Sequence, residues 1–524
     1  MSHSQCRLRH HTLMSVAVGL SAVLALGACT NAAKQQDQAN AAGTGGVAQD
    51  GGTLTVAQTS DADPGSFLKT SVGNILTEYS VLETLTRISA KTGKPEGVLA
   101  KSWRLAPNGK SMDIRLKPGI KFHSGAPLTA NDVVFTLQKV KDPGTGAANQ
   151  AIAADITKMQ AVGDEEIKLT FARPLPSIFD LLETMPILNP KSYAKYAAGK
   201  TVDGTGPFTW KSWTPGGKIV LAKNPNYRDA KSVHLKQIVV DIITDPTALL
   251  SAIRSGRVQY AVGMGALNAY TLSKQSGYNL ISTGGSAIPL GFDVKQKPFD
   301  KKAVRQAAQY AIDRDRIVKQ VESGQGTATS LPWKTSAVGY DKSQADHYKY
   351  DPKKAKQLLQ KAGVGNVSFD MVTLNTPEAK GIFQIVKNNL DKVGLHANAV
   401  TLSATEFDAR IAAGNMKAPA FLLLASNGLS PASAVLGRAE LLASKNPENF
   451  SSPKYTQLVR DVSAATTEGA QVKALSSYNK YFLDQAFAVP LITRPSLSVS
   501  TSDVHGVTGT QMGFIDLTHA WVNK

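Results

Sequence analysis

Residues 367–402 place a strand, a helix and a second strand in succession, and this order constrains the fold more than any other feature of the sequence. Residues 367–374 alternate apolar and polar side chains, as on a half-buried strand. A helical stripe of apolar residues begins at Thr376-Pro377, and another apolar run follows His396. Such a unit packs its helix against the face of a sheet, so the sequence predicts an α/β protein with mixed sheets.

Other segments carry equally local signals. Asp351-Pro352 and Asp245-Pro246 each combine an N-cap carboxylate with proline at the first helical position, which predicts helices that end at Gly363 and Gly256. Period-2 alternation predicts strands that contain the pairs or triplets Leu54/Val56, Met112/Ile114/Leu116, Ile167/Leu169/Phe171 and Ile219/Leu221.

Lys301–Val321 has apolar residues at helical spacing. We expect a single amphipathic helix with its apolar stripe in the core. Its basic side chains are then most simply a face in contact with solvent. They are Lys302, Arg305, Arg314 and Arg316.

Length and cysteine placement limit the possible classes of protein. A chain of 524 residues is too long for one ordinary domain, so we expect two or three lobes. The two cysteines, Cys6 and Cys29, both precede residue 30, which leaves the folded body without a thiol, a disulfide or a cysteine-ligated metal. The body also lacks two histidines at helical i, i+4 spacing. We therefore expect neither a metal site nor a cofactor.

Residues 1–28 have the pattern of a leader for export. Arg7 and Arg9 precede an apolar run, Leu13–Leu26, that is shorter than a membrane span of about 20 residues. The run ends in Leu-Gly-Ala-Cys, which resembles the lipobox of bacterial lipoproteins, where the cysteine is acylated and becomes the first residue. We expect residues 1–28 to be a lipoprotein signal peptide and Cys29 to be the lipidation site; an ordinary signal peptide with an incidental cysteine is the alternative.

Residues 29–52 are predicted to form a flexible tether. They are rich in Ala, Gly and Gln, and they bury too little apolar surface to offset the entropy of ordering them. The chain has a formal net charge of +18, which would fall to +16 on loss of the leader. A basic excess can indicate nucleic acid or anionic lipid as a partner, but here it is spread over the whole chain. We expect no nucleic-acid partner.

One enzyme motif has to be considered. Ser66 and Lys69 match the S-x-x-K of penicillin-recognising serine enzymes, and Lys91-Thr92-Gly93 matches their K-T-G. No S-D-N lies between these two elements, and we interpret the match as coincidence. An exported serine acyltransferase that uses Ser66 and Lys69 is nevertheless kept as an alternative. The same S-x-x-K pattern recurs at Ser192, Ser451 and Ser477.

Four separated blocks, in this order, resemble the bacterial extracellular solute-binding proteins of family 5, the peptide, oligopeptide and nickel receptors of ABC importers. The resemblance runs from about Gly52 to the C-terminus. The first block is the most specific. The blocks are Leu99–Phe135 (LAKSW, LKPGIKFHSG and LTANDVVF), Gly204–Tyr227 (GTGPF and LAKNPNY), Phe299–Arg314 (VRQA and AIDR) and Tyr350–Gly363 (YDPKKA).

The resemblance implies a clamp of the periplasmic-binding-protein type II, with two main lobes, an inserted third lobe and mixed sheets. Ligand would lie between lobes I and III, which would close on it like a hinge. A protein of this kind binds its ligand by shape and hydrogen bonds, and we expect no enzymatic activity. The expected divisions are residues 53–96, 201–285 and 494–524 for lobe I, 97–200 for inserted lobe II, and 286–493 for lobe III.

Candidate ligand contacts lie on loops at strand ends. We select Tyr79 and Glu83 in lobe I, Trp333 in lobe III, and a polar segment of lobe III. Aromatic rings would supply flat contact surfaces, and amides would fix the orientation of the ligand. Plain packing is the alternative for each. The segment is Ser426-Asn427-Gly428-Leu429-Ser430, and Ser426, Asn427 and Gly428 are its main candidates.

The same segment departs from the peptide-binding members of the family. Many relatives carry an aspartate where this chain has Asn427–Ser433, and that aspartate pairs with the α-ammonium group of the ligand. No acidic residue lies between Ala425 and Arg438. Because an unpaired buried ammonium is costly, a peptide ligand would need another counter-charge, and Glu83 is the candidate.

These observations predict a lipid-anchored receptor outside the membrane that captures an oligopeptide or a similarly sized solute and delivers it to an ABC permease. The expected partners are the solute, the transmembrane subunits of the permease and the membrane that holds the lipid on Cys29, and we expect a monomer. An envelope adhesion protein is the further alternative, favoured by the basic net charge.

Overall fold

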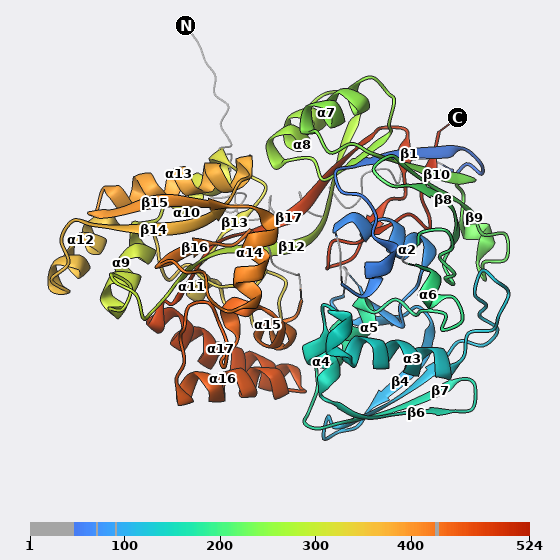
Figure 1. Ribbon diagram of the computed structural model, residues 1–524, viewed down its shortest axis with the longest axis horizontal. Helices are drawn as coiled ribbons and strands as arrows, with labels where there is room; N and C mark the ends of the chain where they lie inside the picture. The colour runs from blue at the N-terminus through green and yellow to red at the C-terminus, as the bar shows by residue number, and fades with distance from the viewer. Residues whose placement is uncertain (1–46, 70–71, 90–91, 197, 425–428, 524) are drawn as a thin grey trace, which may run out of the picture.

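The computed structural model describes residues 47–69, 72–89, 92–196, 198–424 and 429–523. Figure 1 shows two halves joined by two long strands that run between them, β12 (Tyr278–Phe292) and β17 (Ala488–Thr501). These strands pair antiparallel over most of their length, with register shifts at Thr283/Ser286 and Ile288/Pro289. The crossing strands therefore carry one sheet through both halves.

The sheet contains β1 (Thr53–Gln58), β8 (Phe208–Thr214), β9 (Lys218–Lys223), β10 (Gln237–Ile242), β11 (Tyr260–Val262), β13 (Thr327–Ala328), β14 (Val367–Leu374), β15 (Leu395–Leu402) and β16 (Ala420–Leu422) besides the crossing strands. Its order is β15-β14-β16-β12-β17-β11-β1-β10-β9-β8, and β13 pairs with β17. β14 is parallel to β15 and β16, and β1 is parallel to β10 and β11. The remaining pairs in this sheet are antiparallel, which confirms a mixed sheet.

In the first half, the sheet is covered by α2 (Thr77–Val81), α7 (Pro246–Arg254) and α8 (Ala266–Ser273). Leu54 and Val56 of β1 are fully buried, as their alternation predicted. The Asp245 carboxylate caps α7 by accepting the Ala248 N–H at 2.7 Å. The end of the segment predicted as a tether is tied to this half, because Gly51 N–H donates to a backbone carbonyl at 2.8 Å.

A separate antiparallel sheet lies below in the same half, in the order β4 (Ala100–Leu105), β5 (Ser111–Leu116), β7 (Glu166–Phe171), β6 (Ile156–Val162). Met112 and Ile114 point into the core with Ile167 and Leu169, which confirms the predicted alternation. The sheet and its helices fall within residues 97–200, the segment expected to be inserted. The helices are α3 (Ala130–Lys141), α4 (Gln150–Ala154), α5 (Ile178–Thr184) and α6 (Tyr193–Tyr196).

The second half holds α9 (Lys302–Ala311), α10 (Arg314–Gln320), α11 (Lys342–Ala345), α12 (Pro352–Lys361), α13 (Pro377–Asp391), α14 (Ala404–Ala412), α15 (Pro431–Gly437), α16 (Pro453–Ala464) and α17 (Glu468–Gln485). The predicted strand–helix–strand unit is β14-α13-β15, and its strands are parallel. The side chains of Asp351 and Thr376 cap α12 and α13, with proline at the first turn of each.

Short elements complete the chain. They are β2 (Thr86–Ile88) paired with β3 (Pro95–Gly97), β18 (Val504–His505) with β21 (Trp521–Val522), β19 (Thr508–Gly509) with β20 (Ile515–Asp516), and 3-10 turns at Pro64–Lys69, Val72–Asn74, Pro143–Thr145, Ala230–Ser232 and Ala439–Leu441.

The prediction of one helix over Lys301–Val321 is wrong, and the prediction of a solvated basic face holds for Lys302, which is exposed, but not for Arg305 and Arg314. Extended backbone at Ile312 ends α9, and the Asp313 carboxylate starts α10. Arg305 and Arg314 are buried. Arg314 Nε donates to the Pro490 carbonyl at 2.8 Å, and Arg305 Nη1 donates to the Phe299 carbonyl at 2.8 Å.

Backbone carbonyls of a loop and of the crossing strand β17 therefore satisfy these two guanidinium groups in place of water. Burial lowers the pKa of each to about 10. Helical spacing shows which residues share a face of a helix. It does not show whether that face contacts solvent or a neighbouring strand or loop.

Candidate functional site

The two halves contact each other through α5 of the first half and the start of α15 in the second half. Asp180, on α5 of the first half, accepts hydrogen bonds from the hydroxyls of Ser430 and Ser433 at the start of α15 in the second half. The Ser430 hydroxyl also caps α15. Asp180 and Ser433 are buried at this contact. Two elements that lie about 250 residues apart in the sequence thus form one charged hydrogen-bonded contact.

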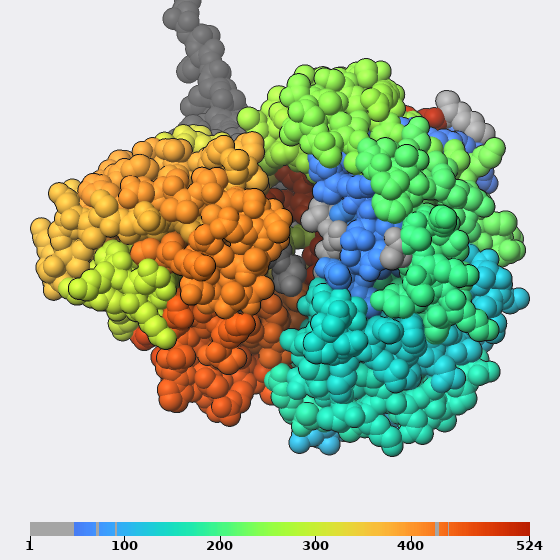
Figure 2. Space-filling model, viewed as in Figure 1, coloured from blue at the N-terminus to red at the C-terminus, as the bar shows by residue number. Residues whose placement is uncertain are grey.

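Two further hydrogen bonds join the first half to the second half. Arg173 Nη1 donates to Ser463 Oγ at 2.7 Å, which joins the inserted segment to the end of α16. Lys334 Nζ donates to Gln511 Oε1 at 3.0 Å. Figure 2 shows the halves in contact around a hollow between them. The structure is therefore a closed clamp.

The crossing strands form one wall of a space of about 180 Å³. Gly284 of β12 has φ of +63°, and a Cβ placed there would lie 2.7 Å from the backbone nitrogen of Gly513. Only glycine allows the strand to pass so close to the C-terminal segment. The space is lined by Ser282, Gly284, Gly285, Gly324–Thr327, Lys334–Ser336 and Thr493–Pro495.

A second space lies beside the first and shares Gly285 and Lys334 with it. It is small, about 10 Å³, which is room for about one water molecule, and its walls combine apolar surface with two cationic side chains. The lining residues are Gly285, Ala287, Pro332, Trp333, Lys334, Ala337, Leu429, Pro431, Ala434 and Arg438. Two of these residues, Trp333 and Leu429, belong to the candidate contacts selected from the sequence.

Glu183 is a buried acid on α5, one helical turn after Asp180. Burial, and then the Asp180 carboxylate, raise the pKa of Glu183 to about 7. A backbone N–H at Ile88 and the cations Lys334 and Arg87 act in the opposite direction. The same two acids partly offset the lowering of the Lys334 pKa that burial causes. Charges from both halves are therefore coupled across the clamp.

Tyr79 and Glu83 line a different cavity, of about 170 Å³, inside the first half. Tyr79 is buried, packs against Phe514 with the two rings tilted and their centroids 4.7 Å apart, and donates to the backbone carbonyl oxygen of Glu183 on α5. Burial raises the pKa of its hydroxyl well above the usual range. The structure brings Tyr79 and Glu83 neither into the second space, which Trp333 lines, nor into the first, although Tyr79 contacts α5.

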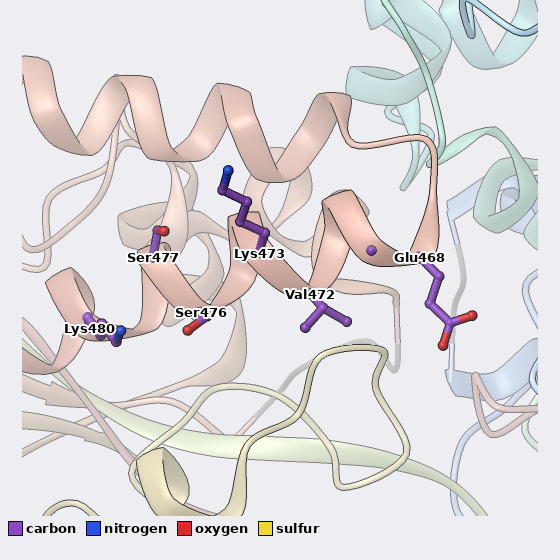
Figure 3. Close-up of a pocket in the computed structure, with 7 residues that line it drawn as sticks. Glu468, Val472, Lys473, Ser476, Ser477 and Lys480 are labelled. Carbon is purple, nitrogen blue, oxygen red and sulfur yellow. The ribbon is translucent and has the colours of Figure 1, made fainter.

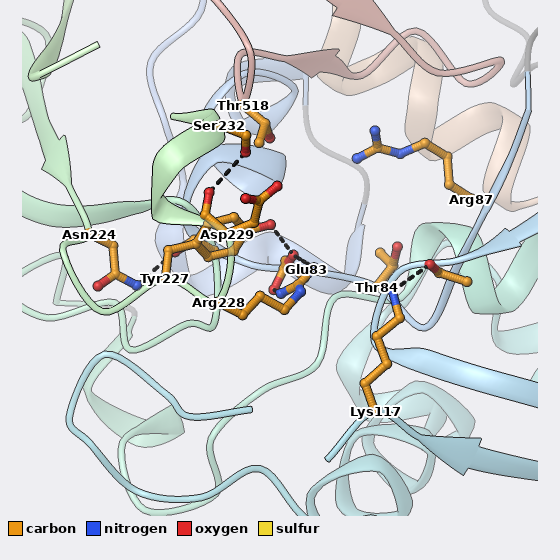
Figure 4. A network of polar contacts seen from close by, with 12 residues as sticks. Glu83, Thr84, Arg87, Lys117, Asn224, Tyr227, Arg228, Asp229, Ser232 and Thr518 are labelled. Carbon is orange, nitrogen blue, oxygen red and sulfur yellow. Dashed lines mark hydrogen bonds and ion pairs between the residues drawn. The ribbon is translucent and has the colours of Figure 1, made fainter. Parts of the chain in front are cut away.

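Glu83 already has a counter-charge. Arg228 donates two hydrogen bonds to its carboxylate, at 2.6 and 2.7 Å, and the Tyr227 hydroxyl donates a third at 3.0 Å (Figure 4). This bidentate pair leaves the Glu83 carboxylate only 6% exposed. A ligand ammonium would have to compete with Arg228 for it.

Replacement of Arg228 by methionine should lower the free energy of unfolding by about 2 kcal/mol, because it leaves the buried Glu83 carboxylate with one hydroxyl as its partner. Arg104→Met is the matched control. Arg104 pairs with Asp113 on the surface, where the arginine side chain is 84% exposed, and its loss should cost no more than about 0.5 kcal/mol. Urea unfolding measures both changes; equal losses would contradict the structural role of the buried pair.

Trp333 packs in the second half and lines the second space. Its side chain is buried, and its indole N–H donates to Asn479 Oδ1 of α17 at 2.7 Å. Asn479 in turn donates to Gln344 at 2.9 Å, so this loop is held by a buried polar chain. The neighbouring Lys334 is thereby fixed at the crossing strands. Ser426, Asn427, Gly428 and Cys29 lie outside the described residues.

The serine-enzyme alternative has no support in the local geometry. Ser66 is buried, and its hydroxyl donates to the Asp63 carboxylate. Lys69, which would have to act as its base, is exposed. Within the described part of the chain, no group of three or more His, Cys, Asp or Glu side chains could hold a metal ion. None of the helices that the structure describes is both long and apolar enough to cross a bilayer.

A shallow hollow on the outer face of α17 is not part of the clamp (Figure 3). All of its lining residues belong to that helix, and neither the crossing strands nor the first half contributes to it. They are Glu468, Gly469, Val472, Lys473, Ser476, Ser477 and Lys480.

Sequence reasoning missed Asp180, Glu183 and Lys334. The two acids sit at i, i+3 spacing in an otherwise apolar helix, IFDLLET, and acids on a buried helix are a signal of unusual partners. Lys334 directly follows the selected Trp333, but no local pattern marks a lysine that will lie between two halves.

Comparison with known proteins agrees with this architecture. The curated relatives include heme-binding protein A of Haemophilus influenzae, 25% identical over 80% of this chain and 82% of that protein. They also include di/tripeptide-binding protein 1 of Pseudomonas aeruginosa, 26% identical over 79% of this chain and 83% of that protein.

Among solved structures, the ABC transporter substrate-binding protein CtaP of Listeria monocytogenes superposes with a TM-score of 0.80 at 20% identity, covering 91% of this chain and all of that one. The Bacillus subtilis oligopeptide-binding protein AppA, in complex with a nonapeptide, gives a TM-score of 0.76 at 20% identity with the same coverage. These similarities confirm the fold of a type II clamp.

A sequence model for the middle part of one family matches residues 94–436, more than half of the chain. Proteins of that family bind solutes and are not enzymes. On this match, with the clamp architecture described above, the chain belongs to the bacterial extracellular solute-binding proteins, family 5.

Proposed function

We propose that this protein is the substrate-binding lipoprotein of an ABC importer. It captures an oligopeptide or a similarly sized solute outside the cell membrane and delivers it to the permease. The observation that carries this proposal is the closed clamp, in which Asp180, Ser430 and Ser433 join the halves in front of the crossing strands. A clamp that closes over a space needs no reactive side chain to hold its guest.

The relatives support a solute of this size without fixing its identity. One is described as binding heme and another as binding di- and tripeptides. The described residues of this chain place polar and cationic groups beside apolar walls at the crossing strands. These walls suit a guest with both apolar and charged parts.

Native mass spectrometry of the protein purified without refolding tests the proposal. We expect a population that is heavier than the polypeptide by the mass of one solute molecule, because a closed clamp releases its guest slowly. Gentle activation should remove the added mass intact. A protein that carries no added mass, and gains none when exposed to peptide and metabolite mixtures, would contradict the proposal.

The anchor is tested separately. Cys29→Ser should move the protein from the detergent phase to the aqueous phase in a Triton X-114 partition, because the acyl chains are lost with the sulfur. Cys6→Ser is the matched control, since Cys6 lies within the leader and should leave the partition unchanged. Detergent-phase partition of the Cys29 variant would exclude lipidation at this residue.

A further inference from the structure

Among the described residues, Lys334 lies on the one loop that lines both spaces at the crossing strands. The loop follows β13 and carries Pro332 and Trp333 into the second space and Thr335 and Ser336 into the first, so that Lys334 stands between the two. Trp333 is held by Asn479, which fixes the root of the loop. The ammonium group therefore lies in the closed clamp on a rigid support.

The charges around these spaces do not balance. Their described lining residues include three cations, Lys334, Arg438 and Arg494, and no aspartate or glutamate. Arg438 is paired with Glu440. Arg494 is paired with Glu378 at 2.7 Å.

Lys334 is different from the two arginines. Its Nζ donates to the amide oxygen of Gln511, and no carboxylate oxygen in the described part of the chain comes within 4.0 Å of it. Asp180 and Glu183 act on it only at longer range. A partly buried ammonium without a close counter-ion is costly, and an anion brought by a guest would remove that cost.

The backbone leaves room for such an anion. Gly285 on β12 has no side chain, and a Cβ placed there would lie 3.8 Å from Lys334 Cδ and 3.9 Å from the Arg494 carbonyl. A larger residue would fill the space beside the lysine stem. The glycine thus keeps the approach to the lysine free between the two spaces.

We propose that Lys334 binds an anionic group of the solute, most simply a carboxylate, and so makes this clamp selective for acidic or zwitterionic guests. This inference rests on the proposed function and deepens it. Lysine binds a carboxylate as a point charge with three donors, so the Gln511 contact can be kept or exchanged when the guest enters.

Three probe mixtures test the inference on the full mature protein by isothermal titration calorimetry. They are tripeptides with free carboxyl termini, the same tripeptides amidated at the C-terminus, and non-peptide organic acids represented by citrate and gluconate. The variants are Lys334→Met and Lys334→Arg, with Lys473→Met on the outer face of α17 as the matched control.

We expect the wild-type protein to bind one of the two acidic mixtures at least about tenfold more tightly than the amidated peptides, since a hydrogen bond to a charged group is lost without the carboxylate. Lys334→Met should abolish this preference, Lys334→Arg should keep most of it, and Lys473→Met should leave it unchanged. Which acidic mixture binds identifies the source of the carboxylate.

Two results would overturn the inference while leaving solute capture intact: equal wild-type affinity for acid and amide, or an unchanged preference in Lys334→Met. Binding of only the organic acids, with the preference lost in Lys334→Met, would support the inference and replace oligopeptide by organic acid as the solute. Binding of none of the three mixtures would overturn the inference, and a solute carried by the purified protein in native mass spectrometry would then leave the proposed function standing.

Discussion

Alanine in place of Asp180 should weaken solute binding by about a hundredfold. The Asp180 carboxylate accepts hydrogen bonds from Ser430 and Ser433 across the contact between the halves. When the clamp opens, water can replace these bonds, so the contact favours the closed form selectively. Two charge-assisted hydrogen bonds are worth on the order of 3 kcal/mol, which equals about a factor of a hundred in the closed-to-open ratio.

Calorimetric titration with the free tripeptide mixture measures this change. Asp180→Asn should recover part of the affinity, because an amide oxygen still accepts one bond. Asp113→Ala is the matched control within residues 97–200, since among the described residues Asp113 forms its ion pair with the exposed Arg104 alone. Wild-type affinity in Asp180→Ala would show that the contact does not hold the clamp closed.

Glu183→Gln should stabilise the protein at pH 8 by on the order of 3 kcal/mol and leave its stability unchanged near pH 4.5. Burial raises the pKa of Glu183 from its ordinary 4.5 to about 7. Between these two values the folded protein holds a proton that the unfolded chain has lost, so stability falls as pH rises to about 7 and remains lower above it. Glutamine removes this loss because it does not ionise.

The groups around Glu183 do not reverse the direction in which the stability of the folded protein changes with pH. Asp180 favours the protonated form, whereas Lys334, Arg87 and the Ile88 N–H favour the charged form and are already included in the pKa of about 7. Glu322, with a pKa also raised to about 7, makes the wild-type curve fall further, but it is present in both proteins. Asp516 has a lowered pKa, so it ionises below this pH window.

Thermal unfolding of both proteins at a series of pH values between 4.5 and 8 provides the measurement. The two curves should coincide at the acidic end and separate steadily toward pH 7. Glu165→Gln, at an exposed position of the inserted segment, should follow the wild type throughout. Parallel curves for Glu183→Gln and wild type would mean that Glu183 is not a buried, protonated acid.

The sequence predicted elements whose signals are local. The caps at Asp245, Asp351 and Thr376 depend on a side chain and an amide three residues away, and all three form. Alternation in β1 and β5 marks one buried face and needs no knowledge of the partner strand. These signals were sufficient for the α/β class and for the parallel unit β14-α13-β15.

The candidate site depends on contacts that no local pattern contains. Asp180 meets Ser430 across 250 positions, and Lys334 meets Gln511 across 177. Arg314 was expected in solvent because its helical face alone was considered, whereas the crossing strand β17 at Pro490 and the loop at Tyr348 cover it. Tyr79 and Glu83 were chosen for their chemistry, and the fold pairs Glu83 with Arg228.

Small-angle X-ray scattering, before and after the bound solute is removed by dialysis in denaturant and refolding, tests directly whether the crossing strands act as a hinge. We predict that the emptied protein has the larger radius of gyration and that return of the purified solute restores the smaller one, with the molecule recovered chemically unchanged. Identical scattering from the empty and refilled protein would contradict a receptor that works by closing its two halves on a solute. Recovery of a solute that binding had chemically changed would contradict it as well.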